Sequence, residues 1–179
     1  LFLSCLVLGL LFGQLGELLL REGRRRRGHG LRRGGSSGGA GVGLALRILP
    51  LADGSDFGGS LRHPAAWNNV FGFRTGTGVI PPEGNEQWIS KMGVPGPMAR
   101  HVADLALILS VQAGRHPQSL QSLDVDARAF AGPLDADHKC TRIGWLGDLN
   151  GWAPYEPGVL AVCETALRTF EALGARVDA

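Results

Sequence analysis

The sequence predicts an α/β fold in which short strands alternate with helices. Apolar residues recur at helical spacing in two long segments, 98–113 and 157–173. Short runs that suit strands lie before, between and after these two segments, at 51–53, 70–74, 142–146 and 175–177. The 179 residues are 44% hydrophobic and 19% charged, which is ordinary for one globular domain with a real core. Strands that alternate with helices are typical of layered α/β folds.

Residues 1–33 differ in composition from the rest, so we treat them as an unassigned apolar and arginine-rich segment before a domain at 34–179. The first 16 residues carry no charge, and residues 21–33 hold seven arginines. We rank three interpretations: a mis-framed or disordered segment first, a membrane anchor second, and an arm that binds nucleic acid third. A spanning helix needs roughly 20 apolar residues, and no aromatic residue lies among these arginines to stack on bases.

The first half of the domain is expected to contain a helix over residues 37–49, with Ser37 as its N-cap. This helix is apolar nearly all round, which indicates burial, and Pro50 ends it. A short strand is expected at 51–53, a helical turn interrupted by Pro64 at 60–69, and a second strand at 70–74. Residues 75–85 are rich in glycine and proline and are expected to form a loop.

The second half is expected to hold a helix over 98–113, opened by Pro97 and closed by Gly114. Residues 116–136 are polar and irregular, which favours a surface excursion. A buried strand is expected at 142–146, followed by an amphipathic helix that Pro157 opens and Gly174 closes. The last strand, 175–177, begins where the sequence ends, which leads us to expect a fragment.

Two loops combine serine with glycine. Ser36 lies in the loop 34–39 and Ser60 ends the loop 56–60, 24 positions later. Glycine lets backbone N–H groups come close to a reacting atom. A serine hydroxyl needs a base to become a nucleophile, and the oxyanion that it creates needs N–H donors. The two loops therefore predict a nucleophilic hydroxyl, a relay hydroxyl and an amide-lined anion pocket, the parts of an acyl-transfer site.

Four ordered motifs carry a resemblance to a known family. They are Gly-Gly-Ser-Ser-Gly-Gly at 34–39, Gly-Ser-Asp-Phe-Gly-Gly-Ser-Leu-Arg-His-Pro-Ala-Ala at 54–66, Val-Phe-Gly-Phe-Arg at 70–74, and Gly-Pro-Met-Ala-Arg at 96–100. In this order and spacing they resemble the amidase signature family, over residues 34–179. The resemblance implies a mixed β-sheet flanked by helices, of which this chain would form a part.

The family uses a Ser-Ser-Lys triad, and its motifs assign roles to residues of this chain. Ser60 would be the acyl-forming nucleophile, and Ser36 the bridging serine, which in the family sits on a cis peptide bond. The oxyanion hole would consist of the backbone amides of Phe57, Gly58, Gly59 and Ser60.

Three further residues would support these loops. Asp56 and Arg62 resemble the charge pair that shapes the nucleophile loop in the family, and Ser37 would support the same hydrogen-bond network. The family's lysine precedes the bridging serine, whereas the two lysines of this chain, Lys91 and Lys139, occupy other positions. We therefore expect this polypeptide alone to be inactive or nearly so.

Two neighbours of Ser60 have competing interpretations. His63 is disfavoured as a catalytic base, because Gly-Gly-Ser differs from the Gly-x-Ser-x-Gly elbow of serine hydrolases that use histidine. Trp67 is expected in the core, with a place in the wall of an acyl pocket as the alternative.

The function predicted is hydrolysis of a carboxylic amide C–N bond through a serine acyl-enzyme. One alternative is the glutamine-hydrolysing subunit of a tRNA-dependent amidotransferase, and another is a non-catalytic truncated remnant. We expect a small-molecule amide substrate, no metal or other cofactor, no nucleic acid and no membrane, with a homodimer left open. The three cysteines form no Cys-x-x-Cys pair, so we expect reduced thiols in a cytoplasmic protein.

Overall fold

The computed structural model describes residues 35–82, 92–135 and 137–178. The segment 1–33 and the part of the predicted loop after residue 82 lie outside the described residues. Among the described helices, none is long and apolar enough to cross a membrane. The elements follow the chain in the order α2 (Gly38–Ala45), β1 (Leu51–Asp56), α3 (Arg62–Asn68), β2 (Phe71–Gly72), β3 (Val94–Ala99), α4 (Val102–Gln112), the 3-10 helix η1 (Ala127–Phe130), β4 (Arg142–Gly144), α5 (Val159–Ala172) and β5 (Arg176–Asp178).

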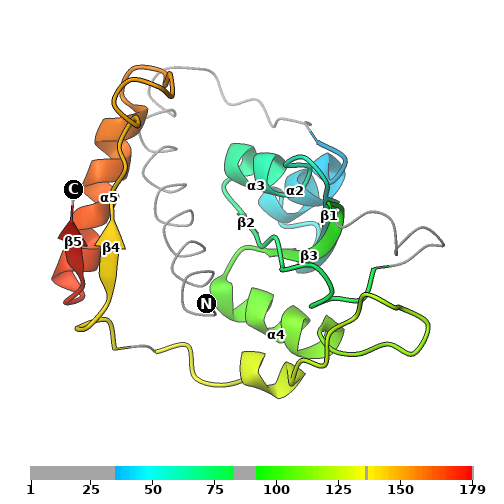
Figure 1. The fold of residues 1–179 in the computed structure, drawn as a ribbon. Coiled ribbons are helices and arrows are strands. Elements are labelled where there is room, and N and C mark those ends of the chain that lie inside the picture. Colours follow the sequence, from blue (N-terminus) through cyan, green and yellow to red (C-terminus); the bar gives the residue numbers. More distant parts are fainter. Residues whose placement is uncertain (1–34, 83–91, 136, 179) are drawn as a thin grey trace.

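The α/β class is confirmed, and both antiparallel and parallel strand pairs are present. β1, β3 and β2 form an antiparallel sheet in that order, with β3 in the centre. β4 and β5 form a parallel pair joined by α5. The described strands thus form two sheets rather than one. In Figure 1, α2 and α3 lie above the three-stranded sheet and α4 lies below it. β4, α5 and β5 lie apart from these elements, at the left of the view.

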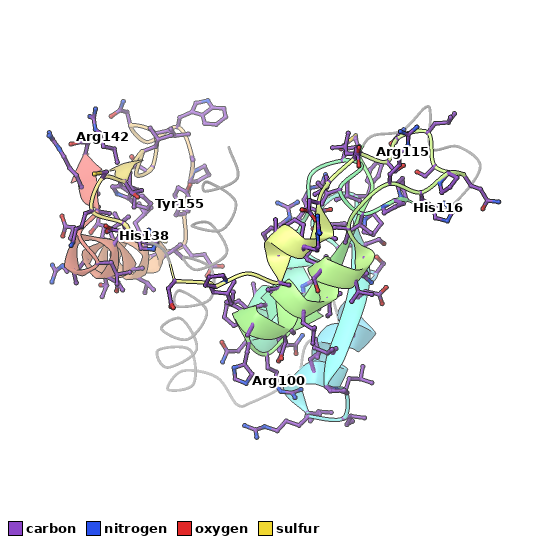
Figure 2. All side chains as sticks on the ribbon, turned by 90° about the horizontal axis from the view of Figure 1, so that it is seen from below. Arg100, Arg115, His116, His138, Arg142 and Tyr155 are labelled. Carbon is purple, nitrogen blue, oxygen red and sulfur yellow. The ribbon has the colours of Figure 1, made fainter. Side chains whose placement is uncertain are left out.

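Helix α2 ends four residues earlier than predicted. Arg47 adopts a left-handed conformation with a φ of 61°, which an α-helix cannot continue through. Arg100 stabilises this end, because its Nη1 donates to the carbonyl oxygens of Leu44 at 3.2 Å and Leu49 at 2.6 Å (Figure 2). The predicted burial holds for Leu44 but is wrong for Ile48, which is 71% exposed beyond the helix end.

β3 corrects the predicted start of the next helix. Residues 94–99 form the central strand although they include Pro95 and Pro97, and α4 begins only at Val102. Pro97 O accepts from Phe73 N at 3.0 Å, and Pro95 O accepts from Thr75 Oγ1 at 2.9 Å. In a strand the N and O of one residue point to the same side, so the N–H groups that the two prolines lack would face β2. Because β2 is only two residues long, the prolines are tolerated in this strand.

α3 also differs from its prediction, because Pro64 does not interrupt it. Pro64 is the third residue of the helix, where a backbone N–H has no acceptor within the helix. The lack of an N–H in proline therefore costs little stability here. The helix ends at Asn68, and the C-cap residue Asn69 has a left-handed φ of 54°. β1 extends three residues beyond the predicted 51–53 and so reaches Asp56.

The main core lies between α2, α3 and the three-stranded sheet. Its fully or nearly fully buried members are Leu44, Leu61, Ala65 and Met98. Leu61 packs on a glycine from each strand: a Cβ at Gly72 would lie 2.8 Å from its Cδ2, and Cβ atoms at Gly96 and Gly54 would lie 3.1 and 3.5 Å from its Cδ1. Because Leu61 follows Ser60 directly, the second serine loop is anchored on the sheet.

The C-terminal unit of β4, α5 and β5 is more exposed than predicted. The strand expected to be buried over 142–146 covers only Arg142–Gly144, and Leu146 is 74% exposed. Arg142 and Arg176 both pair with Asp178, at 2.6 and 2.7 Å. These donors hold the pKa of Asp178 below its usual range, chiefly through the Arg142 hydrogen bond. The predicted excursion is confirmed as irregular over the described residues 116–135, apart from η1.

Candidate functional site

The structure brings the two serine loops into contact. Ser37 N donates to Ser60 O at 3.3 Å. Gly35 has a φ of 75°, and a Cβ there would lie only 2.8 Å from Ser60 O. Both chain neighbours of Ser36 therefore touch Ser60, although 24 positions separate the two serines.

Neither Ser36 nor Ser60 is a buried residue. Ser36 is exposed and Ser60 is partly exposed. No hydrogen bond joins the two hydroxyls in the part of the chain that the structure describes. Hydrogen bonds between catalytic groups are often long before substrate binds. The cis peptide bond implied for Ser36 is not found: no described peptide bond is cis, and a trans bond is lower in energy by about 3–4 kcal/mol for a residue other than proline.

The turn at residues 56–60 is closed by the carboxylate of Asp56. Asp56 Oδ1 accepts from Gly59 N at 2.7 Å, and Oδ2 accepts from Arg62 N at 3.2 Å. Gly59 has a φ of 103°, which suits glycine and allows its N–H to turn inward. This N–H is thus engaged by Asp56, contrary to its predicted place in the oxyanion hole.

The other three predicted donors are differently placed. The N–H groups of Phe57, Gly58 and Ser60 have no hydrogen-bond acceptor among residues 35–82, 92–135 and 137–178. Phe57 is 60% exposed, so this turn reaches the surface of the described structure. Backbone N–H groups that lack a protein acceptor beside an accessible serine can bind an anion.

Asp56 itself is fully buried and is charged, as the predicted pair with Arg62 requires. Arg62 Nε donates to Oδ2 at 2.9 Å, and Nη2 donates to Oδ1 at 3.1 Å, which makes the pair bidentate. Burial raises the pKa of the Asp56 carboxyl, but the hydrogen bonds from Arg62 and from Gly59 N outweigh burial and hold the pKa far below its usual range. Asp56 therefore acts as a permanent acceptor and not as a proton carrier near neutral pH.

Arg74 is a second partner of Asp56 that the sequence did not reveal. Its Nη1 donates to Asp56 Oδ1 at 3.1 Å and to the main-chain oxygen of the same residue. Its Nη2 donates to Met92 O at 2.8 Å. The available signal was an arginine at the end of the predicted strand 70–74, and no local pattern says which acceptors such an arginine reaches.

Ser37 supports the site through the sheet. Its Oγ accepts from Ser55 N at 3.2 Å and donates to Ser55 O at 3.4 Å, which ties the start of α2 to β1. Gly54 makes this approach feasible, because a Cβ at that position would overlap Ser37 Oγ. The predicted supporting role thus has a defined partner, the main chain of Ser55.

His63 and Trp67 flank the turn at residues 56–60. A Cβ at Gly59 would come within 2.5 Å of the His63 ring, so this imidazole covers the turn. The rings of His63 and Trp67 lie 5.7 Å apart. Trp67 is 47% exposed, so its expected place in the core is wrong: α3 turns it outward while burying Ala65 and Asn68.

Of the two lysines, the structure places one, and it lies at the end of α5. A Cβ on Gly174 would be 3.0 Å from Lys139 Cγ, so Lys139 lies beside that glycine. Lys91 lies outside the described residues.

Comparison with known proteins agrees with the motifs. The Amidase family profile matches residues 28–179. A subunit of glutamyl-tRNA(Gln) amidotransferase from Thermus thermophilus is 41% identical over 147 residues, which cover 80% of this chain and 30% of that protein. The corresponding protein of Mycobacterium bovis is 39% identical over 149 residues, 81% of this chain and 30% of that protein.

Solved structures give the same result. A bacterial aryl acylamidase of the amidase signature family matches with a TM-score of 0.74 and 33% identity, over 83% of this chain and 30% of that chain. A peptide amidase from Stenotrophomonas maltophilia matches with a TM-score of 0.59 and 27% identity, over 82% of this chain and 30% of that chain. The chain thus spans less than a third of the length of these relatives. On its motifs, its fold and the extent of the family match, this chain belongs to the amidase family, the amidase signature enzymes.

Proposed function

We propose that this chain supplies the nucleophile half of a serine amidase site that cleaves the C–N bond of a carboxylic amide. Ser60 Oγ attacks the carbonyl carbon, and the amine or ammonia leaves with a proton. Water then releases the acid and restores the serine. The observation that carries this proposal is the contact between the two serine loops, in which Ser37 N donates to Ser60 O at 3.3 Å.

The surrounding residues support specific roles for this reaction. Ser36 would relay the proton of Ser60 to a base. The N–H groups of Phe57, Gly58 and Ser60 would receive the oxyanion, since that of Gly59 is engaged by Asp56. Buried, ionised Asp56 would keep the turn in one shape, so the donors need not reorganise as charge develops.

The experiment that tests the nucleophile is labelling with a fluorophosphonate probe in the full-length protein that carries this sequence. The serine oxygen attacks phosphorus and fluoride leaves, so the label marks an activated serine. We expect Ser60→Ala to abolish labelling and Ser110→Ala to retain it, because Ser110 lies on α4 and donates only to Leu107 O among the described residues. Labelling that survives Ser60→Ala would remove Ser60 from this role, and an unlabelled wild type would favour the non-catalytic remnant.

A second candidate is an amidotransferase component that hydrolyses glutamine and passes ammonia to a partner. It is favoured by the curated relatives at 39–41% identity, which are named as subunits of glutamyl-tRNA(Gln) amidotransferase. Both candidates use the same serine, so labelling does not separate them. Glutaminase activity that rises when a co-purified partner and tRNA are added would select the second. Hydrolysis of simple amides by the protein alone, with no response to tRNA, would select the first.

A further inference from the structure

Two arginines hold the nucleophile turn, and they reach it from different parts of the chain. Arg62 lies six residues after Asp56, within the same loop and helix start, and its side chain is 51% exposed. Arg74 lies 18 residues after Asp56, and its side chain is 28% exposed. Arg62 therefore closes the turn locally, whereas Arg74 connects the turn to the sheet.

The residues on both sides of Arg74 are attached to the central strand. Phe73 N donates to Pro97 O at 3.0 Å, and Thr75 Oγ1 donates to Pro95 O at 2.9 Å. From this fixed base the guanidinium spans the end of β1 at Asp56 and the approach to β3 at Met92. A planar fork with five N–H donors can make all of these bonds together, which a lysine ammonium on a flexible stem cannot do in one fixed geometry.

One of these bonds acts directly on the proposed anion pocket. Arg74 Nη1 donates to the main-chain oxygen of Asp56. That oxygen shares a planar peptide group with the N–H of Phe57, and in a trans peptide the two point in opposite directions. Fixing the Asp56 oxygen therefore fixes the direction of the Phe57 N–H, which is free of protein acceptors in the described residues.

We propose that Arg74 is a positioning residue of the amidase site, which orients the Phe57 N–H toward the oxyanion by holding the Asp56–Phe57 peptide group. This inference rests on the proposed function, since it needs Ser60 as the nucleophile. It assigns to Arg74 an effect on the transition state rather than on substrate binding, because the oxyanion forms only after attack.

The test compares Arg74→Lys, Arg74→Ala and the control Arg128→Ala in the full-length protein, with an amide substrate. Loss of one oxyanion donor typically lowers kcat by about 10²–10³-fold, so we expect that range for Arg74→Ala and roughly tenfold for Arg74→Lys, with KM changed less than about threefold. Millimolar guanidinium should restore part of kcat to Arg74→Ala, and ammonium should not. Arg128 is 90% exposed and pairs only with Asp126 among the described residues, so Arg128→Ala should match the wild type.

Three results would overturn the inference. One is an Arg74→Lys kcat within twofold of the wild type. Another is a rise in KM that accounts for the whole loss. The third is a loss of activity that unfolding explains. Circular dichroism would then show a lower folded fraction with an unchanged kcat per folded molecule, or no folded Arg74→Lys protein at all. Ser60→Ala is assayed in parallel. If this variant remains active, the proposed function itself fails. If Ser60→Ala is inactive while Arg74→Lys is fully active, only the role of Arg74 is rejected.

Discussion

At the scale of single residues, Asp56 determines the shape of the turn at residues 56–60. It is fully buried, and the donors to its carboxylate come from Gly59, Arg62 and Arg74. A buried carboxylate is tolerated only where hydrogen bonds and opposite charge replace its hydration. The turn is therefore stabilised as an ionised network, and its stability depends on the charge of one side chain.

The first prediction concerns acid. The folded pKa of Asp56 lies below its unfolded value, which is about 4. Its contribution to the free energy of unfolding is therefore complete above that value and declines as the pH falls toward the folded pKa. We expect Asp56→Asn to lose about 2–3 kcal/mol at pH 7, and chemical denaturation at pH 7, 4 and 3 would measure it.

The matched control for this experiment is Asp126→Asn, at an exposed pair with Arg128. The wild type should lose stability between pH 4 and 3 more steeply than Asp56→Asn, and Asp126→Asn should follow the wild type. Equal slopes for all three proteins would show that Asp56 does not carry the acid dependence.

At the scale of elements, the three-stranded sheet presents glycines to Leu61, the residue after Ser60. Gly54, Gly72 and Gly96 lie on β1, β2 and β3, and Leu61 packs on all three. Glycine weakens an isolated strand, so these positions are explained by close packing and not by strand propensity. The packing of Leu61 on the sheet therefore fixes the position of the adjacent Ser60.

The second prediction is that Gly72→Ala destabilises the fold by about 1–3 kcal/mol, the usual cost of overpacking a core. The new Cβ would lie 2.7 Å from Ala65 Cβ and 2.8 Å from Leu61 Cδ2, so both must shift. Gly76→Ala is the control, since its Cβ would meet only Val79 Cγ2 at 3.6 Å, an ordinary contact. Thermal melting would compare them, and an equal melting temperature for both variants would contradict the packing argument.

At the scale of the whole molecule, the two described sheets differ in how deeply their residues are buried. Met98 and Ala99 on β3 are fully buried, whereas Arg142 and Gly144 on β4 are exposed. Sheet hydrogen bonds open more often where few apolar contacts cover them. We therefore expect the β4–β5 pair to be less stable than the three-stranded sheet.

Hydrogen exchange measured residue by residue would test this third prediction. The amides of Gly54 and Met98 should exchange at least about tenfold more slowly than that of Ile143, after correction for intrinsic rates. Exchange of all three at one common rate would indicate a single cooperative unit, which would rule out the expected difference.

Much of the fold followed from local patterns, and the misses have physical causes. α5 follows its apolar spacing closely, because one stripe faces β5 and the rest faces outward. β3 was missed because two prolines argue against a central strand. They are tolerated because the strand on the side of their missing N–H groups, β2, has only two residues, and the sequence does not reveal this. Trp67 was misplaced because helical spacing does not say which side of a seven-residue helix meets the core.

The candidate site divides in the same way. The resemblance to the family predicted roles for the two serines, the Asp56–Arg62 pair and Ser37, because its motifs are contiguous runs of sequence. The structure contains the Asp56–Arg62 pair and the hydrogen bonds of Ser37. The engagement of the Gly59 N–H and the reach of Arg74 were not readable, because each depends on the direction of one side chain across the turn.

The sequence by itself thus determined the family, the α/β class and the residue types that could perform acyl transfer, because these are properties of composition, order and spacing. The tertiary structure alone decided that the flanks of Ser36 touch Ser60, which N–H groups stay without an acceptor in the described residues, and that Arg74 reaches the turn. The physical reason is that such contacts join positions 18 to 25 residues apart. Only the packing of the sheet and helices sets the distance and direction between them.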